Sequence, residues 1–322
     1  MAPNLAWIGL GNMGRVRTFK LPLPPSRRLS QAQGMAKNLA AKATLSAPVL
    51  IYNRTTSRAE TFASQNPNTT VASSIQEAVI NSDIIFTCVG DDAAIIQTID
   101  TAVSTGGLKN KVFVDLSTVH PDTTTSISDK IQKHGGRFVA SPVFGAPAMA
   151  EVGQVICVLA GPKEAVEEVK PYTTGVIAKS FMDFSDEPVA KVSQLKVLGN
   201  TFVISMVETI AEGLVVAEKS GLGTDALHQF FEAVFPGPYV AYSARMRSGD
   251  YHKRAEPLFA VDLARKDARH AMDLAKKAGA SMRGLELADG YMAQVKEHMG
   301  ERGDLAGIYG AVRKEGGMEF EN

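Results

Sequence analysis

The chain has 322 residues, enough for two domains of about 150 residues each. Its 45% hydrophobic and 21% charged residues are typical of a soluble globular protein, and its net charge of zero gives no global attraction to nucleic acid or to an anionic membrane. Both cysteines, Cys88 and Cys157, lie in apolar runs, so no disulfide framework is expected. The expected partner is therefore a small molecule, not nucleic acid or a membrane.

A dinucleotide-binding glycine motif lies near the start of the chain, directly after the strand candidate Leu5–Gly9. In such a motif the third glycine opens a helix whose free N–H groups face the cofactor pyrophosphate. Here the segment 15–28 follows, and its three prolines cannot lie in a helix interior, so helical sequence resumes only at Gly34. The motif predicts these cofactor contacts: Gly9, Gly11, Asn12, Met13 and Gly14.

Removing residues 16–33 joins the two halves into GLGNMGRGMAKNLA, a continuous strand, glycine turn and amphipathic helix. The spacing supports this reading, because Asn53 lies 39 residues beyond Gly14, and 21 remain once the 18 inserted residues are removed. The ribose-recognising residue is expected about 20 positions after the motif. We interpret residues 16–33 as an insertion, either a translated intron that begins at Val16 and ends at Gln33 or a natural surface loop.

The residues after the second strand candidate indicate which nicotinamide cofactor the chain prefers. Asn53-Arg54-Thr55 occupies the place where NAD-selective proteins usually carry an acid for the ribose 2′-OH. An arginine with adjacent hydroxyls suits a 2′-phosphate, so NADP is favoured, with NAD possible. Asn53, Arg54 and Thr55, with Val89 at the end of a later strand, are predicted cofactor contacts. The alternative for Arg54 is a solvated charge.

Strand and helix patterns alternate from residue 4 to about residue 186, which predicts a parallel sheet covered on both faces. The strand candidates are Leu5–Gly9, Val49–Asn53, Thr70–Ala72, Asp83–Val89, Lys111–Leu116, Arg137–Val143, Gln154–Ala160 and Lys179–Phe184. From Val189 to Lys219 the sequence predicts one long apolar helix, and the later periodic segments are helical: Thr224–Phe235, Leu258–Ala278, Gly284–His298 and Leu305–Lys314. The expected fold is a Rossmann-type doubly wound α/β domain (residues 1–186) followed by an all-helical domain (residues 187–322) that begins with the long interdomain helix.

Two pairs of residues are candidates for substrate binding or catalysis. Ser117 and Thr118 follow a parallel strand, where doubly wound sheets bind ligands, although they could instead cap the helix that starts at Pro121. Lys196 and Asn200 are four residues apart on one helix face, at the edge of an apolar stripe. Desolvation there would lower the ammonium pKa and favour proton donation to a carbonyl oxygen. The alternative is a snorkelling lysine beside a capping asparagine.

Four motifs in order resemble the β-hydroxyacid dehydrogenase family, which contains 3-hydroxyisobutyrate and tartronate semialdehyde reductases. They are the joined GLGNMGRGMAKNL, Asp115-Leu116-Ser117-Thr118, Lys196-x-x-x-Asn200, and the segment from Phe259 to Lys266-Asp267. The resemblance implies an NADP-dependent oxidoreductase that interconverts a small hydroxy acid and its aldehyde or ketone. It implies that Lys196 is catalytic, that Asn200 and Ser117 contact substrate, and that Lys266 contacts cofactor or substrate. Imine reduction on the same scaffold and an inactive nucleotide-fold protein, disabled by the insertion, are the alternatives.

One segment departs from the family pattern. Ser141–Gly153 aligns with the family's substrate loop, usually a glycine-rich run, but Phe144 stands where a substrate-binding serine is usual and Ala146-Pro147 replaces glycine. Phe144 and Gly145 are still expected to contact substrate. The missing donor predicts a larger or less polar substrate, or a carboxylate held through Ser117 and backbone amides.

Other chemistries find little support in the sequence. The six histidines are scattered without metal-ligand spacing, so no metal is expected. The chain begins almost at once with a strand, which leaves no room for a signal peptide, and no apolar run approaches 18 residues. We expect a cytoplasmic homo-oligomer.

Overall fold

The computed structural model describes residues 2–11 and 30–322, and these fall into two compact units. The first comprises residues 2–11 and 30–196, and the second comprises residues 197–322. The boundary falls inside helix α8 (Ala190–Lys219), which begins in the first unit and continues in the second. Asn12, Met13, Gly14 and most of the predicted insertion 16–33 lie outside the described residues.

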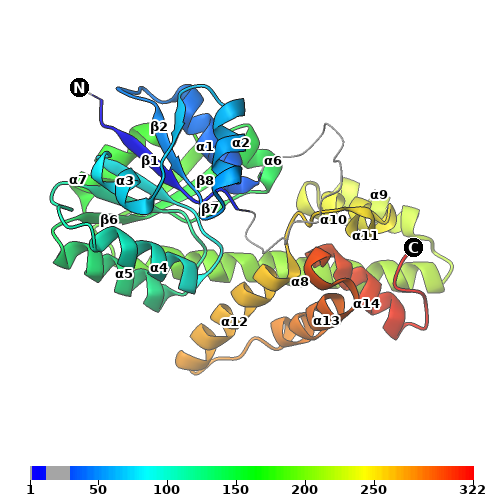
Figure 1. Cartoon of the computed structure of the whole chain (residues 1–322). Helices are drawn as coiled ribbons and strands as arrows, with labels where there is room; N and C mark the ends of the chain where they lie inside the picture. The colour runs from blue at the N-terminus through cyan, green and yellow to red at the C-terminus, as the bar shows by residue number, and fades with distance from the viewer. Residues whose placement is uncertain (1, 12–29) are drawn as a thin grey trace. The chain divides into compact units, whose positions relative to one another are not determined.

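Within the described residues, the first unit contains a nine-stranded sheet (Figure 1). Its strands are β1 (Leu5–Ile8), β2 (Val49–Tyr52), β3 (Thr69–Val71), β4 (Ile84–Thr87), β5 (Val112–Asp115), β6 (Arg137–Ala140), β7 (Val143–Phe144), β8 (Val155–Gly161) and β9 (Ala178–Ser185). They are ordered β3-β2-β1-β4-β5-β6-β8-β7, with β9 paired to β8. The first six strands are parallel, and the strand order reverses between β1 and β4, as in a doubly wound dinucleotide-binding fold.

The far edge of the sheet differs from the predicted all-parallel arrangement. Strand β8 pairs antiparallel with both β6 and β7, so the sheet is mixed. The single strand predicted over Arg137–Val143 is interrupted at Ser141-Pro142, because proline has no N–H to donate to a ladder. The chain resumes as β7, and this short strand carries Phe144, opposite Ile156 of β8.

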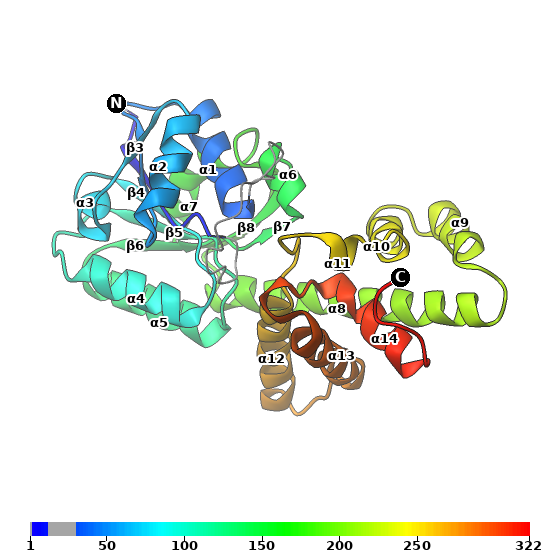
Figure 2. The same cartoon turned by 45° about the vertical axis from the view of Figure 1, so that its right-hand side comes forward.

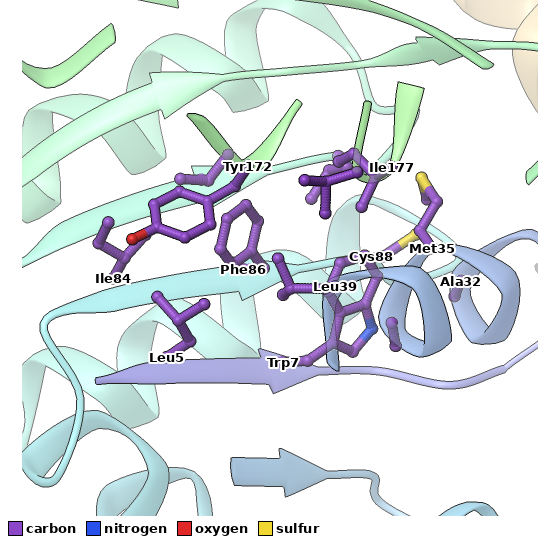
Figure 3. Packing of buried hydrophobic residues seen from close by; sticks show 14 of the residues in the cluster. Leu5, Trp7, Ala32, Met35, Leu39, Ile84, Phe86, Cys88, Tyr172 and Ile177 are labelled. Carbon is purple, nitrogen blue, oxygen red and sulfur yellow. The ribbon is translucent and has the colours of Figure 1, made fainter. Parts of the chain in front are cut away.

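Helices cover both faces of the sheet. One face packs against α1 (Gln31–Lys42), α2 (Thr56–Gln65), α6 (Pro147–Glu151) and α7 (Lys163–Val169), the last followed by a 3-10 turn at Lys170–Tyr172. The other face packs against α3 (Ile75–Ile80), α4 (Asp92–Val103) and α5 (Pro121–Lys133). On the first face Trp7 stacks on Phe86 at 5.8 Å between ring centroids, with Met35 and Leu39 of α1 in the same cluster (Figure 3).

Helix α1 begins at Gln31, three residues before the predicted start at Gly34, and that prediction is therefore wrong. A capping box explains the early start: the Ser30 hydroxyl accepts the Gln33 N–H at 3.1 Å, and the Gln33 side chain accepts the Ser30 N–H at 3.0 Å. Such a cap stabilises a helix by about 1 kcal/mol. The last residues of the predicted insertion are thus the first turn of the helix.

Contacts with α6 fix the middle of α1. Gly34 approaches the α6 backbone so closely that a Cβ would lie 2.7 Å from the Glu151 nitrogen, so only glycine fits there. One turn later, the Asn38 amide donates hydrogen bonds to the carbonyl oxygens of Ala150 at 2.8 Å and Glu151 at 3.1 Å. These bonds hold α1 independently of its first turn.

The second unit is helical, as predicted, throughout residues 197–322. After α8 come α9 (Thr224–Val234), α10 (Pro238–Arg247), α11 (Asp250–Lys253), α12 (Val261–Lys277), α13 (Arg283–Met299) and α14 (Ile308–Glu315), with 3-10 turns at Gly300–Arg302 and Leu305–Gly307. Figure 2 shows α12 and α13 side by side. The sequence did not predict α10 and α11, because α10 buries only Ser243 and Met246 and has no apolar stripe.

Helix α8 is the core helix of this unit. Its Ile204, Val207 and Leu214 are buried in one cluster with α12 and α13. By length and composition α8 could also span a membrane, which corrects the expectation that no segment would qualify. However, 61% of its most apolar stretch is buried within the structure, as in the core helix of a soluble protein.

One buried acid on α8 makes the stability of this unit depend on pH. Burial, followed by the neighbouring Glu212, raises the pKa of Glu208 from 4.5 to about 7. The folded chain therefore keeps a proton that the unfolded chain loses, and the free energy of unfolding falls as pH rises between these values. We expect Glu208→Gln to gain stability relative to the wild type between about pH 5 and pH 8, measured by urea unfolding. A constant difference at both pH values would contradict this, and Glu286→Gln on the exposed side of α13 is the control.

Candidate functional site

The glycine turn lies where the strand order of the sheet reverses. Gly9 has φ of +101°, and a Cβ there would lie 2.3 Å from the Cys88 carbonyl oxygen at the end of β4. Its N–H donates to the Tyr52 carbonyl at 2.8 Å, and its own carbonyl accepts the Trp7 indole N–H at 2.7 Å. The turn is thus bonded to the ends of neighbouring strands, at the edge where doubly wound sheets bind ligands.

Asn53 joins the glycine turn to the loop after β2. Its amide oxygen accepts the Leu10 N–H at 3.0 Å, and its amide nitrogen donates to the Thr55 carbonyl at 3.0 Å. An aspartate could accept the first bond but could not donate the second. This favours asparagine over the acid that would select a ribose 2′-OH.

Two arginines lie at the start of α2. Arg54 is exposed, and the guanidinium of half-buried Arg58 lies 3.9 Å from the position that a Cβ on Gly11 would take. The first turn of α2 contains no acid, although acidic side chains are the ones that a helix N-terminus stabilises. The arrangement suits a bound anion beside Gly11. Arg58 was not predicted from the sequence, although a basic residue in the first turn of a helix beginning at Thr56 was a signal for it.

The Ser117 hydroxyl is engaged by its neighbours. It donates to the Asp115 carboxylate at 2.7 Å and accepts the Val89 N–H at 2.9 Å, joining the ends of β4 and β5. Asp115 is buried and also accepts the Thr87 hydroxyl at 2.8 Å. Burial raises the pKa of this carboxyl, and the hydrogen bonds from Ser117 oppose that shift. Asp115 therefore holds Ser117 in one orientation.

Neither Ser117 nor Thr118 caps α5. The N-cap is His120, whose ring accepts the Asp122 N–H at 3.1 Å, so the alternative capping role is wrong. Thr118 is buried. Their predicted role as substrate contacts stays a prediction.

Lys196 lies on α8 within the first unit and is buried, with 9% of its surface exposed. Its ammonium lies 4.7 Å from the centroid of the Phe144 ring, a cation–π distance. The structure thus brings together the predicted catalytic lysine and the phenylalanine of the predicted substrate loop. The next residue of that loop, Gly145, is exposed, and its carbonyl accepts the Gln31 side-chain amide at 2.9 Å.

Asn200 follows Lys196 by one turn of α8 and is tied to α12 in the second unit. Its amide nitrogen donates to Asp267 at 2.6 Å, and the Lys266 ammonium lies 3.0 Å from the other oxygen of the same carboxylate. All three side chains are buried, which makes the charge-assisted hydrogen bond from Asn200 and the ion pair with Lys266 stronger than at a surface. Asp267 ends the motif that begins at Phe259, but sequence spacing does not show that it joins Asn200 to Lys266.

Taken separately, each unit therefore holds part of the predicted site. The first unit gathers Gly9 and Asn53 around the turn, with the unpredicted Arg58 beside them, and places Phe144 against Lys196. The second unit joins Asn200 to Lys266 through Asp267. Among residues 2–11 and 30–322, no group of three or more His, Cys, Asp or Glu side chains is arranged to hold a metal ion. Cys88 and Cys157 are free and buried, as expected of packed side chains.

Two family descriptions match the chain, one for each part. Residues 32–182 match the NAD binding domain of 6-phosphogluconate dehydrogenase. Residues 191–312 match the NAD-binding region of NADP-dependent 3-hydroxyisobutyrate dehydrogenase. The first match begins inside α1, beyond the segment that separates the glycine turn from this helix.

Relatives cover nearly the whole chain. The NADH-dependent oxidoreductase ucdB of Aspergillus ustus is 36% identical over 287 residues, which are 89% of this chain and 97% of that protein. A Mycobacterium tuberculosis 3-hydroxyisobutyrate dehydrogenase has a similar structure, with a TM-score of 0.76 at 20% identity, over 97% of this chain and all of the other. An imine reductase from Pseudomonas sp. has a TM-score of 0.56 at 18% identity, over 97% of this chain and 99% of its own. At these identities the solved structures show the fold alone.

The doubly wound sheet with its glycine turn, followed by a helical unit, defines a dinucleotide-dependent oxidoreductase. The chain belongs to the β-hydroxyacid dehydrogenase family, in its 3-hydroxyisobutyrate dehydrogenase-like branch. It is an NAD(P)-dependent dehydrogenase that acts on CH–OH groups.

Proposed function

We propose that this enzyme uses NADP to interconvert a small hydroxy acid or related alcohol and the corresponding aldehyde or ketone. The observation that carries the proposal is the buried Lys196, one turn from Asn200 on α8. A buried lysine can give its proton to a carbonyl oxygen, and an adjacent amide can orient that oxygen. Cytoplasmic location and assembly into a homo-oligomer are part of the same proposal.

The residues of the first unit fit a dinucleotide. Gly9 is a position where no side chain can be accommodated, and the backbone at Gly11 is open apart from Arg58. Arg58, Arg54 and Thr55 would hold the 2′-phosphate, and Val89 would line the nicotinamide end. When bound, the cofactor supplies the hydride.

The remaining residues would position and protonate the substrate. Lys196 would donate the proton to the carbonyl oxygen in the reductive direction and recover it in the oxidative one. Asn200, held by Asp267, would orient that oxygen, and Lys266 is held by the same carboxylate for contact with cofactor or substrate. Imine reduction, which the shared fold with the Pseudomonas imine reductase allows, is the second candidate, and reductive assays with a ketone and an amine distinguish it.

The cofactor preference is the first expected outcome. NADPH should bind at least about tenfold more tightly than NADH, because two arginines can pair with the 2′-phosphate. Arg58→Ala should reduce affinity for NADPH more than affinity for NADH, and Arg269→Ala in the second unit is a matched control. Calorimetric titration of the form that lacks residues 16–33 measures both affinities. The Aspergillus relative is named as NADH-dependent, and equal affinities here would refute the NADP assignment.

The proton donor is tested by Lys196→Ala. We expect turnover to fall by roughly 10²- to 10⁴-fold, as for the loss of a general acid, with cofactor affinity nearly unchanged. Lys196→Met gives the same test with the packing of the helix better preserved. Turnover at the wild-type rate in either variant would show that another group donates the proton.

The segment before α1 should affect cofactor binding more than folding. Loop closure costs grow slowly with length, so the sheet tolerates 18 extra residues. The cap at Ser30, however, occupies the Gln33 N–H in the first helical turn, and a pyrophosphate needs such N–H groups. We expect the full chain to be folded but to bind NADPH weakly, and deletion of Val16–Gln33 to restore binding in calorimetry. Ser30→Ala, which removes the cap but keeps the segment, is the control. Tight binding by the full chain would refute this.

A further inference from the structure

The Phe144 ring holds the Lys196 ammonium in a defined place. The ammonium lies 4.7 Å from the ring centroid. The face of an aromatic ring attracts a cation electrostatically, without forming a strong hydrogen bond to it. The ring therefore stabilises the charged lysine at a fixed position. A serine at position 144 would instead present a hydrogen-bond donor at this point.

The strand pairing and packing around Phe144 keep the ring in place. Its residue pairs with Ile156 in the β7–β8 ladder, and its side chain is half-buried against the same hydrophobic cluster as Leu195, the residue before Lys196. The following Gly145 is tied through its carbonyl to Gln31, and Pro147 opens α6 with its φ angle fixed. The loop is therefore poorly able to bring a different side chain to Lys196.

The Ser117 hydroxyl, which was predicted to hold a substrate carboxylate in place of a serine at position 144, already donates its hydrogen to Asp115. A serine hydroxyl has one hydrogen, and Ser117 gives that hydrogen to Asp115 at 2.7 Å while accepting the Val89 N–H. Donation to a substrate carboxylate would leave a buried acid without this bond and would place a second negative charge near it. Ser117 is thus poorly suited to bind a carboxylate.

We propose that Phe144 is the specificity-determining residue of this enzyme: its ring holds Lys196 and selects carbonyl compounds with an apolar, uncharged group beside the carbonyl, instead of a carboxylate. This inference rests on the proposed function and names its substrate class. The selected reaction adds hydride from the reduced cofactor to the carbonyl carbon and a proton from Lys196 to its oxygen, giving the neutral alcohol and the oxidised cofactor. A substrate carboxylate would compete with the carbonyl oxygen for the Lys196 ammonium.

Matched pairs of acid and methyl ester test the selectivity in the full chain at saturating cofactor. The pairs are benzoylformate with methyl benzoylformate, and succinic semialdehyde with its methyl ester. We expect kcat/KM to be at least about tenfold higher for each ester, about the factor that one unfavourable buried polar contact produces. Phe144→Ser should abolish or reverse the preference, whereas Phe144→Leu should keep the preference but lower kcat, because the ring that holds Lys196 is gone.

The test also includes a control variant and a measurement that does not depend on enzyme activity. Phe181→Leu removes a comparable ring, the one 5.4 Å from the Lys170 ammonium, and should leave the ester preference unchanged. Reductive methylation followed by peptide mass spectrometry should show Lys196 labelled about threefold faster in Phe144→Leu, and Lys170 faster in Phe181→Leu, because loss of a ring uncovers the amine and destabilises its charge.

The outcomes separate this inference from the proposed function. Equal kcat/KM values, or a preference for the acids, would overturn the selectivity while leaving the reductase function intact. Unchanged labelling of Lys196 in Phe144→Leu would overturn the role of the ring, whatever the activity. Reduction of neither pair with NADPH or NADH would refute the proposed function, and the selectivity with it. Circular dichroism verifies that each variant is folded.

Discussion

The close approach of Gly9 to the Cys88 carbonyl is the constraint on which the ligand-binding edge of the sheet depends. Strands β1 and β4 leave no room for a side chain there, and the turn is held further by Trp7 and by the amide of Asn53. The Trp7 bond is local to β1 and its turn, whereas the Asn53 bond joins the end of β1 to the end of β2. The geometry of the edge is therefore a property of the sheet and does not depend on a flexible loop.

Polar groups of the candidate site in each unit share a second property, since several are oriented by a buried carboxylate of the same unit. Asp115 holds Ser117, and Asp267 holds both Asn200 and Lys266. Side chains fixed in this way lose little entropy when a ligand binds, which is what a preoriented reaction site needs. In the first unit, an aromatic ring also lies against Lys196.

The parts of the fold that depend on local pattern could be predicted from the sequence. Central parallel strands are apolar on both faces, and α8 is a long apolar helix that buries Lys196, so both were visible as runs of residues. The antiparallel pairing of β8 depends on partners distant in the sequence, and α10 lacks a periodic signal. The capping box at Ser30 was locally visible as S-x-x-Q but was obscured by the prolines before it. Arg58 at Gly11 and the bond from the Val89 N–H to the Ser117 hydroxyl depend on tertiary distances that no spacing rule gives.

Because α1 is held on α6 through its middle, the fold can tolerate changes in the N-terminal turn of this helix. Gly34 and Asn38 fix the helix on α6, so its N-terminal turn can be built from different residues without moving the rest of the helix. In the present chain Ser30 to Gln33 form that turn, and Ala32 is buried two positions before Gly34, where the joined motif would have Gly14. Structural integrity and phosphate recognition are thus separable along a single helix. Residues in the N-terminal turn of α1, which would face the phosphates, can be exchanged while the domain keeps its shape. Correct folding of the chain is therefore no proof that its nucleotide site is intact.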